Sequence, residues 1–236
     1  SQEETITYPP ATIEGFLQNC SPNNGWCTTF PQFSLSADEP LPNYDITAIE
    51  GTWNGQNFAC PESDCSVPLT EGNNALTYWA LSSWGDSSTM GSLTVKVDSQ
   101  QPVISGAFSG TTGSNGWYLG PVSFTGSAAD TTSGLASFTC TLDGAALASC
   151  TSIDVSDEGP HTLVLTALDN AGNSSMVVQD TSIDSRPPAL NSSLQGSLGS
   201  NSWYNDAELH VSASDPIPGS GLFALEYSVD GTAWIT

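Results

Sequence analysis

Apolar and polar residues alternate with a period of two along most of the chain, and this pattern predicts strands. Gly, Pro, Ser and Thr interrupt every stretch that would otherwise suit a helix. Because successive side chains of a strand point to opposite faces of its sheet, each segment has one face to bury. Roughly seven short strands per unit, separated by turn residues, are typical of a β-sandwich. The pattern therefore predicts an all-β chain.

The same succession of segments occurs three times. Each copy contains a Trp motif, and the motifs are 91 and 86 residues apart in the sequence. After each motif come a strand that runs into an acidic residue and a hairpin turn, and two copies continue through a Glu-Gly pair into further strands. Repetition at this period predicts tandem units of one fold. The Trp motifs are Asn24-Gly25-Trp26-Cys27, Asn115-Gly116-Trp117-Tyr118 and Asn201-Ser202-Trp203-Tyr204.

Turn residues mark hairpins within each copy, and prolines mark the joints between copies. Asn-Gly and Asp-Gly accept the positive φ that a two-residue turn requires, which predicts hairpins at Asn54-Gly55, Asp143-Gly144 and Asp230-Gly231. Proline-containing joints follow Asp98 and Asp184, and proline cannot continue a ladder. We therefore predict tandem immunoglobulin-like β-sandwich domains at residues 1–98, 99–184 and 185–236.

The third copy lacks the last strands of the other two. An isolated sandwich of this kind would expose its core and a sheet edge. The first expectation is that the protein continues beyond residue 236. The alternative is that another chain supplies the missing strands.

The charge is strongly one-sided, with 25 Asp and Glu against two Lys and Arg, and a formal net charge of −23. A field of this sign repels phosphates, so nucleic acid and anionic membranes are excluded as partners. No apolar run approaches the length of a membrane span, so no membrane insertion is expected in this segment.

The six cysteines fall into three local pairs. Their spacing does not match zinc knuckles, and the two His lie far from any pair. Six cysteines allow 15 connectivities, of which local closure is the most economical. Three local disulfides predict an oxidising compartment, so the protein is expected to be secreted or on the cell surface. The pairs are Cys20 with Cys27, Cys60 with Cys65, and Cys140 with Cys150.

Together these motifs resemble bacterial immunoglobulin-like repeats, which occur in tandem in large surface and secreted proteins. The resemblance is carried by the Asn-Gly-Trp-Tyr motif, by Ser133-Gly134-Leu135, by the segment 169–173 (Asp-Asn-Ala-Gly-Asn) and by the hairpin 227–234. It implies a sandwich fold and covers nearly the whole chain. It does not select one role, because the family includes spacers, adhesin stalks, filament subunits and appendages of secreted enzymes.

Catalytic chemistry is not indicated, and we expect no enzyme. All cysteines are paired, and His161 and His210 lie in predicted strands without a matching nucleophile motif. Calcium is the one candidate cofactor, because joint acids and turn acids offer oxygen ligands. The alternative is that these acids only end strands and cap turns. The candidate ligands are Asp98, Asp184, Asp169 and Asp130.

The leading hypothesis is a structural segment of a bacterial cell-surface stalk, sheath or filament, whose partner is itself or a surface polysaccharide. The alternatives are an adhesin or carbohydrate-binding region and a non-catalytic appendage of a secreted hydrolase. Trp26, Trp117 and Trp203 suit packing or sugar stacking, and the additional Trp53, Trp79 and Trp84 make the first copy the better candidate for a carbohydrate face. Candidate glycosylation sequons begin at Asn19, Asn173 and Asn191.

Overall fold

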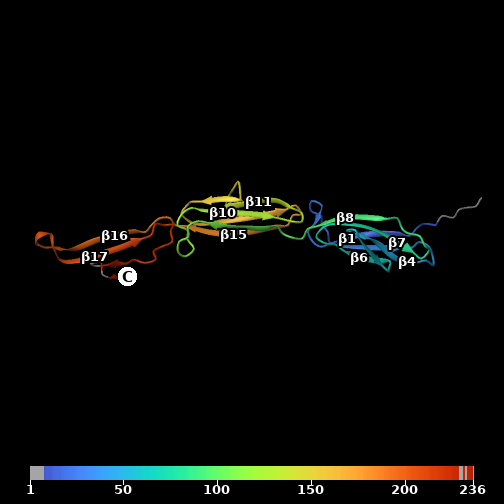
Figure 1. The fold of residues 1–236 in the computed structure, drawn as a ribbon, viewed down its shortest axis with the longest axis horizontal. Helices are drawn as coiled ribbons and strands as arrows, with labels where there is room; N and C mark the ends of the chain where they lie inside the picture. Colours follow the sequence, from blue (N-terminus) through green and yellow to red (C-terminus); the bar gives the residue numbers. More distant parts are fainter. Residues whose placement is uncertain (1–7, 229–230, 232, 236) are drawn as a thin grey trace, which may run out of the picture. The chain divides into compact units, whose positions relative to one another are not determined.

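The computed structural model describes residues 8–228, 231 and 233–235, and its regular structure consists almost entirely of strands (Figure 1). In these residues the only helical element is the 3-10 turn η1 (Ser200–Ser202). No helix of the described part has the length and hydropathy needed to cross a membrane. The predicted all-β fold is confirmed.

Residues 12–97 form two sheets. A three-stranded sheet has the order β1-β3-β6, and a five-stranded sheet has the order β2-β8-β7-β4-β5. The strands are β1 (Thr12–Gln18), β2 (Trp26–Cys27), β3 (Gln32–Asp38), β4 (Ile46–Trp53), β5 (Gln56–Cys60), β6 (Asp64–Pro68), β7 (Gly72–Ser82) and β8 (Gly91–Val97).

The core between these sheets consists of the inward residues of the alternating segments. Phe33, Leu35, Ile49 and Leu76 are at most 2% exposed. Full burial of each such side chain stabilises the fold by about 1.5–3 kcal/mol. At Gly51 a Cβ would lie 2.1 Å from the Thr77 carbonyl oxygen, so only glycine fits between strands β4 and β7 there.

Residues 103–183 repeat this arrangement. One sheet has the order β13-β10-β9, and the other has the order β12-β11-β14-β15. The first, second and fifth strands thus form one sheet and the remaining four form the other, which confirms the predicted immunoglobulin-like sandwich. The strands are β9 (Val103–Ser109), β10 (Val122–Ala129), β11 (Leu135–Leu142), β12 (Ala145–Ala146), β13 (Ser152–Val155), β14 (Gly159–Asp169) and β15 (Ser174–Ile183).

In the first two copies, the Trp motif leads into a short parallel pairing with the last strand of its own sandwich. Asn24 and Asn115 have φ of 48° and 54°, and each is followed by a glycine with positive φ. After the turn, Cys27 pairs with Val97 in the first copy, and Tyr118 forms a bridge with Ile183 in the second. The motif therefore closes the edge of a sheet. Trp26 and Trp117 are half-buried, whereas Trp203 is 76% exposed.

The predicted hairpin turns at Asn54-Gly55 and Asp143-Gly144 are confirmed. Asn54 and Asp143 have φ of 50° and 51°, and both glycines also have positive φ, as a type I′ turn requires. Asp230 of the third predicted turn lies outside the described residues.

Two antiparallel hairpins follow residue 188, and most of their side chains are exposed. Leu190, Leu198 and Leu209 are 66%, 66% and 54% exposed, and the described residues provide no opposing sheet that would cover them. The strands are β16 (Ala189–Leu198), β17 (Tyr204–Ser214), β18 (Tyr227–Ser228) and β19 (Trp234–Ile235).

The chain divides into two compact units. One contains the residues up to Val103 together with the loop regions Ala128–Phe138 and Thr166–Ser175. The other contains Ile104–Ser127, Thr139–Leu165 and the residues from Met176 onward. Two loop regions of the second sequence copy thus pack with the end of the first copy. The predicted division at residues 98 and 184 stays a prediction.

A buried polar side chain occupies the third position of strand β7 and of strand β14. In β7 it is Asn74, which is fully buried, accepts hydrogen bonds from Trp53 Nε1 and Thr70 N, and donates to the Thr70 carbonyl. In β14 it is His161, which is 8% exposed. Each side chain ties the start of its strand to the preceding loop.

Candidate junction site of three aspartates

Asp98 directly follows strand β8 and is fully buried. Its Oδ1 accepts a hydrogen bond from Gln100 N at 3.1 Å, which fixes the turn into the next copy. Its Oδ2 accepts one from Ser133 N at 3.0 Å, although Ser133 is 35 residues further along the chain. The residue at the predicted joint therefore binds a loop of the following sequence copy.

Asp130 organises that loop. It directly follows strand β10, and its Oδ1 accepts hydrogen bonds from the backbone N of Thr132, Ser133 and Gly134 at 3.1, 2.9 and 2.8 Å. Gly134 has a φ of 83°, which favours glycine at this position. The carboxylate thus folds a tight turn around itself and presents Ser133 N to Asp98.

Asp169, the last residue of strand β14, organises a second loop in the same way. Its Oδ1 accepts hydrogen bonds from Gly172 N and Asn173 N at 2.7 and 2.8 Å. The Asn173 amide nitrogen lies 2.9 Å from Asp169 Oδ2 and 3.0 Å from the Asp98 carbonyl oxygen, so it can donate to both. Asn173 therefore links the second loop to the joint.

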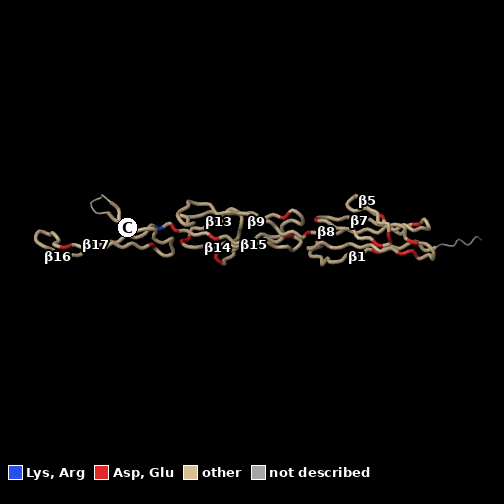
Figure 2. The backbone as a smooth tube through the Cα atoms, turned by 90° about the horizontal axis from the view of Figure 1, so that it is seen from below, with Lys and Arg blue, Asp and Glu red and all other residues tan. Residues whose placement is uncertain are grey.

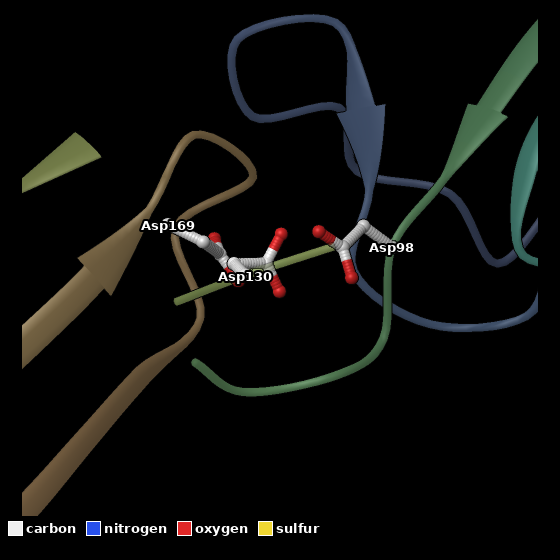
Figure 3. Close-up of side chains that lie close together, drawn as sticks. All are labelled: Asp98, Asp130 and Asp169. Carbon is white, nitrogen blue, oxygen red and sulfur yellow. The ribbon is translucent and has the colours of Figure 1, made fainter. Parts of the chain in front are cut away.

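The three carboxyl groups lie close together. One oxygen from each of Asp98, Asp130 and Asp169 lies within 4.8 Å of the other two. Figure 3 shows the three groups approaching from separate segments. Asp98 and Asp169 are buried and Asp130 is partly exposed. Three carboxylates this close repel one another, and each accepts hydrogen bonds from backbone N–H groups.

The two basic side chains of the sequence lie elsewhere. Lys96 Nζ lies 5.4 Å from the centroid of the Trp26 ring, and Arg186 donates a 2.6 Å hydrogen bond to the Pro218 carbonyl. Acidic residues, in contrast, occur along the whole described chain, many of them in turns and at strand ends (Figure 2). Neither basic side chain therefore neutralises the negative charge of the aspartate cluster.

Asp184, the fourth predicted ligand, lies apart from the cluster and repeats the role of Asp98 after strand β15. Its Oδ2 accepts a hydrogen bond from Ser220 N at 2.7 Å, and hydrogen bonds from Ser220 hold the pKa of Asp184 below its ordinary value. Asp215 Oδ2 accepts one from Gly221 N at 2.6 Å, much as Asp130 does from Gly134. The joint geometry thus occurs twice.

A Glu–Ser contact that was not predicted from the sequence supports both joints. Ser99 N donates to the Glu71 carboxylate at 3.2 Å, and Ser185 N donates to Glu158 at 3.0 Å; each serine hydroxyl also bonds to its glutamate. The hydrogen bonds from Ser185 lower the pKa of Glu158. The recurring Glu-Gly and Asp-Ser pairs were a visible signal, but the sequence did not show that they meet.

The structure contains the three predicted disulfides, Cys20–Cys27, Cys60–Cys65 and Cys140–Cys150. The sequon residues differ in their surroundings. Asn19 and Asn191 are exposed, whereas the Asn173 amide is engaged at the joint. Attaching a glycan at Asn173 would remove the donor that links the second loop to Asp98.

The three additional tryptophans of the first copy also differ in their surroundings. Trp53 packs against the core and donates to Asn74. Trp84 is 49% exposed and makes an edge contact with Tyr44, with ring centroids 4.8 Å apart. Trp79 is half-buried and lines a surface groove.

No protein-family model matches the chain, and no curated protein matches it. Among solved structures, it is similar to the fibronectin(III)-like modules of Clostridium thermocellum CbhA, with 14% identity over 73% of this chain and 92% of that chain and a TM-score of 0.29. It is also similar to part of a 1.5-MDa bacterial ice-binding adhesin, with 10% identity over 89% of this chain and 85% of that chain and a TM-score of 0.32. The fold assignment above rests on the strand order of the chain itself.

Proposed function

We propose that this chain is a structural segment of a secreted bacterial cell-surface stalk, sheath or filament, in which the joints between sandwiches are held stiff. The observation that carries the proposal is the hydrogen bond from the backbone N of a distant serine to the joint aspartate, which is present at both Asp98 and Asp184. A stiff joint keeps successive domains at a fixed distance. The three disulfides support a location in an oxidising compartment.

The distance across the first joint tests this role. Spin labels on Thr94→Cys and Ser137→Cys, both exposed positions, would report it by pulsed electron paramagnetic resonance. We expect one narrow distance distribution, which Asp98→Ala broadens and Asp154→Ala, a change of an exposed acid, leaves narrow. A broad distribution already present in the parent chain would contradict the spacer role.

We further propose that a calcium ion binds between Asp98, Asp130 and Asp169. The three proposed ligand atoms are carboxylate oxygens, which suit a hard cation, and two of the three residues are buried. A divalent cation would offset the repulsion among three negative charges and would join the end of strand β8 to two loops of the next copy. Its contribution there is electrostatic and mechanical.

Calorimetry with and without calcium tests the ion site. At a calcium concentration about 100 times the dissociation constant, we expect stabilisation by about 3 kcal/mol and a corresponding rise in the unfolding temperature. Asp98→Asn should abolish this calcium-dependent rise, whereas Asp154→Asn should retain it. If calcium produces no binding heat and no rise relative to chelator, the carboxylates act only through their hydrogen bonds.

A further inference from the structure

A groove of about 300 Å³ lies on the sheet of the first sandwich, lined by residues of strands β4, β5 and β7. Glu50 is paired across the sheet with Trp79 on one side and with Ala59 on the other. Ile49 and Ala80, the preceding and following residues of the two strands, are fully buried in the core. Because side chains alternate between faces, Glu50 and Trp79 lie on the outer face.

The lining combines two aromatic residues, Trp79 and Phe58, with polar groups of two kinds. The Trp79 indole is half-buried, the Glu50 carboxylate is an acceptor, and the Asn57 amide both donates and accepts. Ala59 is small and leaves room beside Glu50. A mostly concave site with an aromatic wall and a few polar groups is typical of small-ligand binding.

We propose that this groove binds a pyranose unit of an uncharged glycan. The face of an indole ring carries partial negative charge and attracts the slightly positive C–H groups on one face of a sugar ring. Sugar hydroxyls both donate and accept, which matches the carboxylate of Glu50 and the amide of Asn57 together. This role adds to the spacer function and does not depend on it.

The charge of the chain selects among glycans. A net charge of −23 and the carboxylate within the groove repel sulfated, phosphorylated and uronic acid polymers. A quaternary ammonium ligand is the competing occupant, because a cation also binds an indole face. Such ligands are held by several aromatic rings, whereas Phe58, the second aromatic residue of the lining, packs its ring against the core. The lining therefore favours the neutral sugar.

Affinity electrophoresis of the full chain in gels that contain soluble β-glucan, xylan, mannan or galactan tests the proposal, with alginate as the anionic comparison. We expect at least one neutral polymer to retard the chain. Trp79→Thr, which keeps a strand-forming residue, should weaken that retardation about tenfold or more. Trp84→Ala removes an exposed indole elsewhere and serves as the matched control.

Glu50→Gln provides a second variant that leaves the ring and the side-chain volume in place. It should weaken binding while the unfolding temperature stays unchanged. The proposal is overturned if no neutral polymer retards the chain, if Trp79→Thr and the parent chain are retarded equally, or if only alginate retards the chain. Because these readouts do not involve the joints, they fail independently of the distance measurement on the spacer.

Discussion

Replacing Asp98 by alanine is expected to destabilise the folded joint by about 3 kcal/mol, because the change leaves Gln100 N without its acceptor and removes one of the two acceptors of Ser133 N. Gln100 N and Ser133 N both donate to this carboxylate, which is fully buried. Water does not readily replace a buried acceptor, so the desolvation cost of the Gln100 N–H group is not recovered. The loop that contains Ser133 should then separate from the end of strand β8.

Amide hydrogen exchange resolves this loss better than a single melting curve, because a chain of several units need not unfold in one step. With calcium removed, Asp98→Ala should accelerate exchange of the Gln100 amide by roughly a hundredfold, as a loss of about 3 kcal/mol implies. Exchange of the Ser133 amide, which keeps Asp130 as an acceptor, should accelerate by less. Asp98→Asn keeps one oxygen acceptor and should have a smaller effect. Unchanged protection of both amides in Asp98→Ala would show that the Asp98 carboxylate does not hold the joint.

The sequence was sufficient to predict the sandwich and its turns, because those features depend on local pattern. Alternation located the strands, and the positive φ of Asn54 and Asp143 follows from the Asn-Gly and Asp-Gly pairs themselves. Joint acids were also visible, since Asp98 and Asp184 precede prolines at repeated positions. What these residues contact was not predictable, because Ser133 meets Asp98 only after two sheets have formed.

The acidic cluster and the aromatic groove show the same limit. Asp98, Asp130 and Asp169 meet, whereas Asp184 belongs to the other joint, and this grouping depends on which loops reach which strand end. The adjacent Tyr78 and Trp79 of strand β7 are both aromatic, so alternation alone did not show which one faces the core. The pairing of Ala80 with Ile49 decides that Trp79 faces outward.

The second large effect is expected from His161→Ala. His161 Nδ1 lies 2.7 Å from Asp143 Oδ2, and Nε2 lies 2.8 Å from the Asp157 carbonyl oxygen. Both ring nitrogens face acceptors, so the doubly protonated ring donates two hydrogen bonds. Removing the ring leaves a cavity and breaks both hydrogen bonds, and we expect a loss of about 3 kcal/mol at pH 6. Amide hydrogen exchange of strand β14 in the full chain measures it.

The pH dependence of this contact has a definite sign. Burial disfavours the charged ring, but the hydrogen bonds to Asp143 and to the Asp157 carbonyl outweigh it and raise the pKa of His161 above 6.5. A raised folded-state pKa contributes stability that is complete below the unfolded value and is lost as pH rises through the folded value. The bond to His161 lowers the pKa of Asp143, so that contribution disappears only in acid, as pH falls through the lowered value.

The first sandwich supplies the matched control, because Asn74 holds the equivalent strand position with an amide that does not titrate. His161→Asn should therefore recover part of the stability that His161→Ala loses. It should also remove the decline of stability above pH 6.5, while Asp143→Asn, which keeps an oxygen acceptor, should weaken that decline. If the parent chain and His161→Asn lose stability equally between pH 6 and pH 9, the ring is not charged in the folded state, and its two contacts are those of a neutral imidazole.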